Sequence, residues 1–435
     1  MDGLQRNLNS HSPNNQNFTP ELSSDIYQFE PKFTPDFSSL GRYVESSSPY
    51  EEQNAVSRLQ INRSRRYKLK EFAQKVLVGA GIKQGLEYPT NIHPTAGCMH
   101  VRISRKVDVH RSKKHGKAFY GGLQTCGNVF TCPICAAKIQ EHRRQEIAKA
   151  FEATYRGDFG SKKIVMVTLT FSHKIADKIG ELLVKQAEAF KKLRAGKVWA
   201  RIKNKFGFIG LIRTLEVTHG ANGWHPHTHE AWIVDKSTDV EDLHREVLAR
   251  WFKYCKKLGL VGRNVKAFME RSVHIVDNCS TSKYLAKEDG TGNLGIDSPV
   301  KWGADRELAK SSSKLGRAAG KHSFELLADY GDGDKKAGKL FLDYAFAMKG
   351  RAQIFWSQGL KGLVGVNEKT DEQIVEEHID SAELLAKLSE YEWDLVCRYK
   401  MKSKVLDIAE NYGTKGIFSL MENLSRMKMK CYQRE

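Results

Sequence analysis

The chain has 435 residues and carries 70 Lys and Arg side chains against 51 Asp and Glu, a formal net charge of +19. Residues 1–60 are acidic overall, so residues 61–435 carry a formal charge of +23, which favours a polyanionic partner such as nucleic acid and argues against a hydrolase of small molecules. No segment approaches the ~18 consecutive apolar residues that cross a bilayer, and the N-terminal residues do not follow the plan of a secretory signal, so we expect a cytoplasmic protein without membrane contact. The alternative explanation of the charge is a solvated lysine-rich surface.

The first predicted region is a disordered leader over residues 1–60. It is rich in Ser, Asn and Gln and contains five of the ten prolines, so it offers too little apolar surface to offset the entropy of ordering. After it the composition becomes basic, and the apolar spacing predicts an amphipathic helix from Arg63 to Val76. This helix opens the second predicted region, a basic cysteine-rich module over residues 61–150.

Four of the eight cysteines lie between positions 98 and 135. Such clustering in a chain without an export signal favours metal binding over disulfide bonds. Two thiolates flank the tight turn C-P-x-C, which suits a structural Zn²⁺ ion in a closed tetrahedral site. The four predicted ligands are Cys126, Cys132, Cys135 and either Cys98 or His100. The alternative is that these cysteines are small reduced residues of the core.

Basic side chains surround the cysteines, in the runs RISRKVDVHRSKKHGK and EHRR. Lysine and arginine neutralise phosphates, so a module of this kind would bind DNA with a steep dependence on salt. The predicted DNA contacts are Arg105, Lys106, Arg111, Lys113, Lys114, Arg143 and Arg144.

Strand and helix patterns alternate in the third predicted region, residues 151–290. The strands are predicted from β-branched and apolar runs such as IVMVTLTF, and the helices from apolar residues at helical spacing. In chain order we expect strand 164–171, helix 178–192, strands 206–217 and 225–234 around a turn at 219–223, helix 242–258, strand 272–276 and helix 280–288. This β-α-β-β-α-β-α order predicts an α+β fold with an antiparallel sheet and helices packed on one side of it.

The most specific signal is the run WHPHTH in the second strand of the predicted hairpin. Because side chains alternate faces along a strand, His227 and His229 point to the same side and can bind one divalent ion. The partner strand brings Glu216 across as a third ligand, which leaves coordination positions open for a substrate phosphate. His225 is either a fourth ligand or an orienting neighbour. The alternative is a group of partly buried histidines satisfied by hydrogen bonds.

The run SKYLAK follows the last predicted strand. A helix there places Tyr284 and Lys287 on the same face. A phenol with a reference pKa of about 10 is a poor nucleophile at neutral pH, so it needs a neighbouring cation and a polarised phosphorus in front of it. Lys287 and the predicted metal ion can supply these two requirements.

These three runs resemble, in order, the three motifs of the HUH endonucleases. More narrowly, IVMVTLTF, LEVTHGANGWHPHTH and SKYLAK are similar to the rolling-circle plasmid replication initiators that have a single catalytic tyrosine. The resemblance covers residues 95–365, where the runs CGNVFTCPIC and GKLFLDYAFAMKGRAQIFWSQGLKGL also look like that family. It implies an HUH endonuclease core, with His227 and His229 as metal ligands, Glu216 as the third ligand, Tyr284 as the nucleophile and Lys287 as the assisting cation.

The resemblance also implies the reaction and the partners. The expected activity is nicking of one strand at a plasmid double-strand origin that is single-stranded at the nick site, by metal-assisted transesterification. The products are a 5′-phosphotyrosine link and a free 3′-OH. The implied metal is Mn²⁺ or Mg²⁺, and a host helicase and polymerase are the expected protein partners.

Two positions depart from the family pattern. Thr228 stands between the two histidines, where the family has a bulky apolar residue. Some relatives carry a carboxylate just before the tyrosine to activate water, but this chain has Ser280 and Ser282 there. Asp277 and Glu288 are the remaining candidates for that role.

The last two predicted regions are a flexible basic segment, residues 291–340, and a helical C-terminal region, residues 341–435. Residues 382–388 have helical apolar spacing, and LDIAENYGTKGIFSLMENL has a glycine between two helical runs, which suggests either a helix–turn–helix or ordinary packing. Other functions to weigh are a relaxase or transposase of the same superfamily, although a relaxase would place its tyrosine before the histidines, and a non-catalytic zinc-containing DNA-binding protein.

Overall fold

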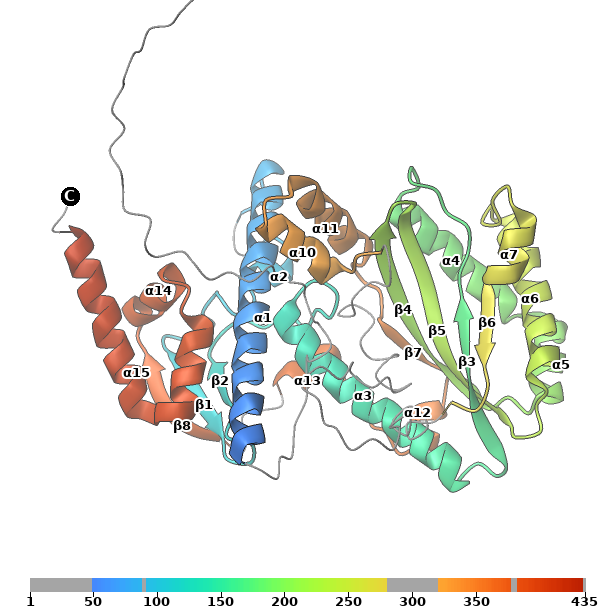
Figure 1. Cartoon of the computed structure of the whole chain (residues 1–435), viewed down its shortest axis with the longest axis horizontal. Helices are drawn as coiled ribbons and strands as arrows, with labels where there is room; N and C mark the ends of the chain where they lie inside the picture. Colours follow the sequence, from blue (N-terminus) through green and yellow to red (C-terminus); the bar gives the residue numbers. More distant parts are fainter. Residues whose placement is uncertain (1–48, 88–90, 280–319, 377–381, 433–435) are drawn as a thin grey trace, which may run out of the picture. The chain divides into compact units, whose positions relative to one another are not determined.

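The computed structural model describes residues 49–87, 91–279, 320–376 and 382–432 (Figure 1). Most of the predicted leader lies outside this part of the chain, as does the predicted helix 280–288. Helix α1 (Pro49–Lys83) begins inside the range predicted for the leader, because no proline or glycine interrupts residues 50–78 and proline fits the first turn of a helix. The predicted helix from Arg63 to Val76 is therefore the middle of a longer one.

A three-stranded antiparallel sheet joins the predicted cysteine-rich module to the C-terminal region. Its strands, in spatial order, are β2 (Ala118–Gly121), β1 (Val107–Ser112) and β8 (Ala382–Leu388). Helices α14 (Glu390–Arg398) and α15 (Lys402–Tyr432) pack against it. Arg63 on α1 forms buried ion pairs with Asp407 and Glu410 on α15, so residues far apart in sequence make one packed unit.

The prediction that residues 341–435 are wholly helical is wrong at β8 and at β7 (Ile354–Trp356). Leu384, Leu385 and Leu388 fit helical spacing, but the segment pairs with β1, and a β-bulge interrupts the register of that pair. Pairing with a distant strand thus overrides the local pattern. The helices α12 (Leu360–Leu363), α13 (Asp371–Glu376), α14 and α15 agree with the prediction, and α15 breaks at Gly413, where φ is 58°. In the described ranges no helix is both long and apolar enough to cross a membrane.

The larger sheet has five antiparallel strands in the order β6-β3-β5-β4-β7, which confirms the predicted α+β class. Its first four strands in sequence are β3 (Lys162–Leu169), β4 (Gly210–Gly220), β5 (Gly223–Asp235) and β6 (Val273–Val276). The helices between them are α4 (Ile179–Leu193), α5 (Gly196–Lys205), α6 (Val240–Lys257) and α7 (Val265–Arg271). The predicted order of elements is present from the first strand to β6, with α5, α7 and the edge strand β7 in addition, and the last predicted helix lies outside the described residues.

The helices between the strands pack on one face of this sheet, as predicted, and a helix of the preceding region covers the other face, which was not predicted. On one face, Trp232 of β5 is buried beside α4, where Phe190 stacks on Trp251 of α6. On the other face, Ile147 and Phe151 of α3 (Pro133–Arg156) pack in one apolar cluster with strand residues of β3, β4 and β5. Cys132 caps the start of α3, at the far end of the helix from this cluster. His227 and His229 lie on the same face as this cluster. Side chains alternate between the two faces along a strand, so residues 227, 229, 231 and 233 all point to one side.

Residues 320–340 of the predicted flexible segment 291–340 belong to the described part of the chain, and they contribute to two helices and the core. Helices α10 (Ser323–Gly331) and α11 (Lys335–Ala347) form there. Phe324, Leu326 and Leu327 are buried, and both helices contact α1. The basic composition of the segment led to the prediction of flexibility, although these apolar residues belong to the core.

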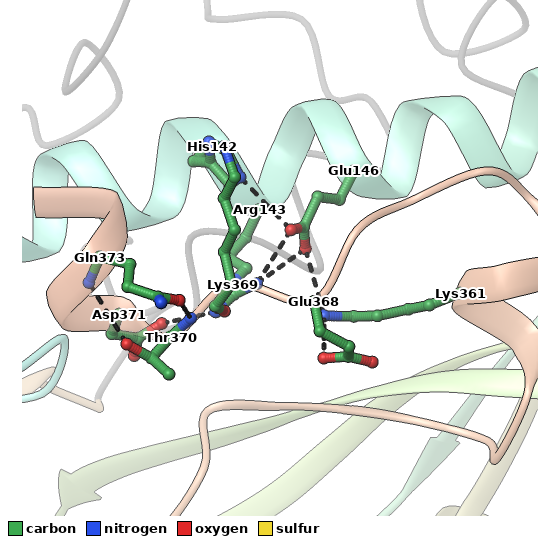
Figure 2. A network of polar contacts seen from close by, with 9 residues as sticks. All are labelled: His142, Arg143, Glu146, Lys361, Glu368, Lys369, Thr370, Asp371 and Gln373. Carbon is green, nitrogen blue, oxygen red and sulfur yellow. Dashed lines mark hydrogen bonds and ion pairs between the residues drawn. The ribbon is translucent and has the colours of Figure 1, made fainter. Parts of the chain in front are cut away.

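A polar network fastens the connection after α12 to helix α3, as Figure 2 shows. Arg143 donates to Glu146 at 2.9 Å, to Asp371 at 2.8 Å and to the carbonyl oxygen of Lys369 at 2.8 Å. Lys361 lies 3.9 Å from Glu146 across the same network. We therefore assign Arg143 to this internal network rather than to DNA.

Candidate metal centres

The β4–β5 hairpin carries the predicted metal ligands. Its two-residue turn lies between the paired residues Gly220 and Gly223. Gly223 has a φ of +85°, and a Cβ atom there would lie 2.8 Å from the Cα of Ile175, so the turn requires glycine. The turn sets the register in which Glu216 is directly opposite His227.

The structure brings Glu216, His227 and His229 together on one face of the sheet. Nε2 of His227 lies 3.5 Å from Oε1 of Glu216, and Nε2 of His229 lies 3.5 Å from Oε2. The three residues offer ligand atoms that all lie within 4.8 Å of one another. Two imidazoles and one carboxylate at these distances fit a divalent ion, with coordination positions left for a substrate.

Contacts at Nδ1 orient both rings. Thr168 of β3 lies opposite His229, and its Oγ1 is 3.1 Å from Nδ1 of that ring. Nδ1 of His227 is 3.4 Å from the backbone oxygen two residues before it. In both rings Nε2 is left facing Glu216, an arrangement typical of histidines that bind metals.

His225 lies beside these ligands but outside their cluster. Its Nδ1 is 2.8 Å from Nε2 of His173, and its Nε2 is 3.4 Å from Oγ1 of Thr170. Burial, together with the rings of His227 and His173, lowers the pKa of His225 to about 3. Of the two predicted roles, the geometry supports the orienting neighbour.

Two histidines of this site were missed by sequence reasoning. His173 joins His225 to the hairpin turn, because its Nδ1 lies 3.0 Å from the carbonyl oxygen of Asn222. His322, at the start of α10, places its Nε2 3.4 Å from Oε1 of Glu216. No local pattern marks either residue, because each is brought to the hairpin by tertiary folding.

The two departures from the family pattern can be examined in part. Thr228 is 1% exposed and lies on the opposite face from the histidines, so it occupies a buried position as an apolar residue would. Asp277 lies 2.8 Å from Nζ of Lys163. Glu288, Ser280 and Ser282 lie outside the described residues.

The predicted nucleophile Tyr284 and the predicted cation Lys287 also lie outside the described residues. Described residues near the two ends of the range that contains them contact the larger sheet. Cys279 packs in the apolar cluster of the histidine face, and its backbone N–H donates to the carbonyl oxygen of Ile164 at 2.8 Å. On the other side, Lys321 forms a β-bridge with His219 at the end of β4.

The four cysteines form a second cluster. Cys98, Cys126, Cys132 and Cys135 offer sulfur atoms within 4.8 Å of one another. Neighbouring Sγ atoms are 3.6–3.7 Å apart, and the cysteines are free thiols rather than disulfides. Three of the four are buried. Four thiols in this arrangement fit a closed tetrahedral site, the chemistry expected of structural zinc.

The structure also decides which upstream residue joins this cluster. Cys98 belongs to it, whereas Nδ1 of His100 lies 3.1 Å from Nζ of Lys402. Hydrogen bonds from the other three thiols hold the pKa of Cys135 well below its ordinary value, while burial raises the pKa of Cys132. Four sulfur atoms so close together suit a bound cation, which would favour their deprotonated forms.

The predicted DNA contacts separate into two groups. The exposed group lies on either side of strand β1: Arg105, Lys106, Lys113 and Lys114. The second group forms ion pairs within the chain: Arg111 donates to Glu383 at 2.8 Å and Arg144 donates to Glu141 at 2.7 Å, and Arg143 belongs to the network of Figure 2. The first group remains a proposed DNA contact.

Together these observations define an α+β protein with a candidate His/Glu metal centre on an antiparallel sheet and a candidate Cys₄ centre. Residues 122–253 match the family described as Replication protein. The matched range contains Glu216, His227 and His229 and three of the four clustered cysteines. This part of the chain is thus similar to replication proteins, which confirms the resemblance to the rolling-circle replication initiators.

The chain is also similar to two curated proteins. Protein rep of Streptomyces lividans is 27% identical over a match that covers 57% of this chain and 65% of the relative. The Neomycin resistance protein of Streptomyces cyanogenus is 29% identical, over 28% of this chain and 33% of the relative. The chain thus spans less than two thirds of the length of either relative. No solved structure matches it.

Proposed function

We propose that this chain is a plasmid replication initiator that nicks one DNA strand by metal-assisted tyrosine transesterification, as an HUH endonuclease. The observation that carries the proposal is the cluster of Glu216, His227 and His229 within the range that matches the replication protein family. Its three ligand residues lie on rigid paired strands. A site that keeps coordination positions open suits catalysis rather than structural support.

A divalent ion held by these residues would polarise a non-bridging oxygen of the scissile phosphate. By ligand type alone, two imidazoles and one carboxylate also suit zinc or another transition metal. The family resemblance favours Mn²⁺ or Mg²⁺. The protein's own contribution is to fix the two rings through their Nδ1 contacts and to hold the carboxylate between them.

Tyr284 is the proposed nucleophile and Lys287 the cation that stabilises its phenolate. The phenolic oxygen forms a bond to phosphorus, the bond from phosphorus to the 3′-oxygen breaks, and the proton lost by the phenol is balanced by one gained at the 3′-OH. One phosphodiester replaces another, so no ATP is required. Reach is consistent with this assignment for the nearer histidine: five residues after Cys279 can extend about 17 Å. The backbone of Cys279 bonds to Ile164, and His229 lies about 13 Å along β5 from Ile233, the residue opposite Ile164.

The DNA that fits this proposal is a plasmid double-strand origin with a single-stranded nick site. The exposed basic residues beside the cysteine cluster would bind the phosphate backbone. The free 3′-OH would prime a host polymerase, and a host helicase would unwind the duplex ahead of it. An initiator of this kind works in the cytoplasm.

The proposal is tested with labelled single-stranded origin DNA of the chain's own replicon, incubated with Mn²⁺ and separated by denaturing electrophoresis. The wild-type chain should give a shortened strand and a covalent protein–DNA adduct. Tyr284→Phe should lose both while still shifting the DNA in a native gel. Tyr391→Phe, at a half-exposed position on α14, is the matched control and should behave as the wild type.

Other outcomes would replace the proposal. If Tyr284→Phe cuts at the same position, Tyr284 is not the nucleophile. If the wild-type chain binds the DNA and leaves it intact with every divalent metal, it is a non-catalytic zinc-containing DNA-binding protein. If the chain forms the covalent adduct but does not support replication of a plasmid in cells, it is a relaxase or transposase of the same superfamily.

A further inference from the structure

Three imidazoles, not two, surround the carboxylate of Glu216. Besides His227 and His229, the ring of His322 places Nε2 3.4 Å from Oε1. Only 2% of the His322 side chain is exposed, and only 8% of the Glu216 side chain. A buried carboxylate with imidazoles at both oxygens is tightly restricted in its rotation.

The backbone around His322 is fixed to the hairpin. Lys321 and His219 exchange two backbone hydrogen bonds, of 2.8 and 2.9 Å. The carboxylate of Glu325 accepts the backbone N–H of His322 at 2.7 Å. A Cβ atom on Gly320 would lie 3.0 Å from Oγ1 of Thr218, so a small residue lets this segment approach β4 closely.

His322 stands apart from the ligand cluster in how it meets the carboxylate. The cluster of possible ligands with mutually close atoms consists of Glu216, His227 and His229. His322 reaches the carboxylate from α10, and it shares Oε1 with His227. Residues that hold a ligating carboxylate in this way tune the affinity of a metal site.

We propose that His322 is the positioning residue of the metal centre: it holds the carboxylate of Glu216 in its ligating orientation. This inference rests on the proposed function, because it assumes that the cluster binds a catalytic ion. If His322 has this role, the metal centre depends on two segments, the β4–β5 hairpin before positions 280–319 and α10 after them. The ion then binds tightly only when the hairpin and α10 are packed together.

The test measures Mn²⁺ binding to the full chain by isothermal titration calorimetry, separately from nicking. His322→Ala should weaken Mn²⁺ binding by about 10–100-fold, the range typical when such an outer partner is removed. His322→Gln should restore most of the lost affinity, because its side-chain amide can also donate a hydrogen bond. In His322→Ala, nicking should recover as the Mn²⁺ concentration is raised.

His219→Ala is the matched control. It removes another imidazole from the same β-bridge, where the ring packs edge-on against Trp224 at 4.8 Å between centroids, and it should leave Mn²⁺ binding unchanged. Thermal unfolding of each variant shows whether the fold is retained. If His322→Ala is folded and binds Mn²⁺ as the wild type does, His322 has no positioning role, although the proposed function stands.

Two further results would also overturn the inference, and they can be told apart. If Ala and Gln variants lose Mn²⁺ equally, and high Mn²⁺ restores neither, His322 is itself a ligand. If the wild-type chain binds no divalent ion, the catalytic metal centre fails, and the proposed function fails with it.

Discussion

The two candidate metal centres of this chain are built in opposite ways. The cysteine centre takes its four thiols from loops and from the first turn of α3, and three of them are buried. The histidine centre takes its three ligands from neighbouring positions on paired strands, and the His227 and His229 side chains keep 13% and 15% of their surface exposed. The first centre is closed by protein ligands alone, whereas the second leaves room for another ligand.

The two arrangements suit different roles. A closed four-thiol centre contributes folding free energy, and a three-ligand centre with open positions can act on a substrate. Helix α3 connects the two, because Cys132 caps its start and Ile147 and Phe151 pack on the histidine face of the sheet. We therefore expect damage at the cysteine centre to reach the sheet through α3, and damage at the histidine centre to remain local.

The largest expected effect is on chemistry at the histidine centre. His227→Ala should lower the nicking rate by about 10³-fold or more, since losing a metal that stabilises the transition state costs several kcal/mol and each 1.36 kcal/mol is tenfold in rate. Added Mn²⁺ should not restore it. The rate is measured on single-stranded origin DNA at saturating protein.

The control for this variant is His244→Ala, whose ring contacts the carbonyl oxygen of Val273 at 3.2 Å and has no place in the metal cluster. It should nick at the wild-type rate, and both variants should unfold within a few degrees of the wild type. Full activity in His227→Ala would mean that the histidine centre takes no part in nicking, and that the two centres do not differ in role as proposed.

The next effect is on stability at the cysteine centre. The purified chain should contain about one zinc ion, and Cys132→Ser combined with Cys135→Ser should contain none. We expect Tm to fall by about 10 °C or more, because structural zinc contributes several kcal/mol and each kcal/mol shifts Tm by roughly 2–4 °C in a domain of this size. Calorimetry and metal analysis measure both.

Cys397→Ser is the matched control, because this half-buried thiol is free and lies outside the cluster. It should keep its zinc and most of its thermal stability. A double variant that keeps the wild-type Tm would mean that the clustered cysteines are ordinary core residues.

Features determined by neighbouring residues could be predicted from the sequence, and features determined by distant residues could not. The β4–β5 hairpin was predicted correctly because its information is local: a glycine turn, alternating side chains and Glu216 in register with His227. His322 and the contact of His173 with His225 were missed, because each depends on segments brought together by folding. Strand β8 was predicted as a helix, since Leu384, Leu385 and Leu388 satisfy helical spacing and only the distant strand β1 decides otherwise.

The same distinction between local and tertiary information applies to charge. From sequence, all seven basic residues near the cysteines looked alike as DNA contacts. In the folded chain, Arg143 bonds Glu146 and Asp371 and so stabilises the position of α13 on α3. Lys113 and Lys114, at the β1–β2 turn, are exposed. Only residues of this second kind can neutralise DNA phosphates without breaking internal ion pairs.

The smallest expected effect separates DNA binding from chemistry. Lys113→Gln combined with Lys114→Gln should weaken duplex binding several-fold and reduce the slope of log affinity against log salt by about 1.8, because each phosphate contact contributes about 0.9. Arg144→Gln, which removes one charge that is already paired with Glu141, should leave the slope unchanged. Nicking of a short single strand at saturating protein should be equal in all three chains, since these residues would act before the strand reaches Glu216 and its histidines. A loss of nicking under those conditions would mean that the cysteine-rich region takes part in the reaction itself, and the division between a structural and a catalytic centre would have to be abandoned.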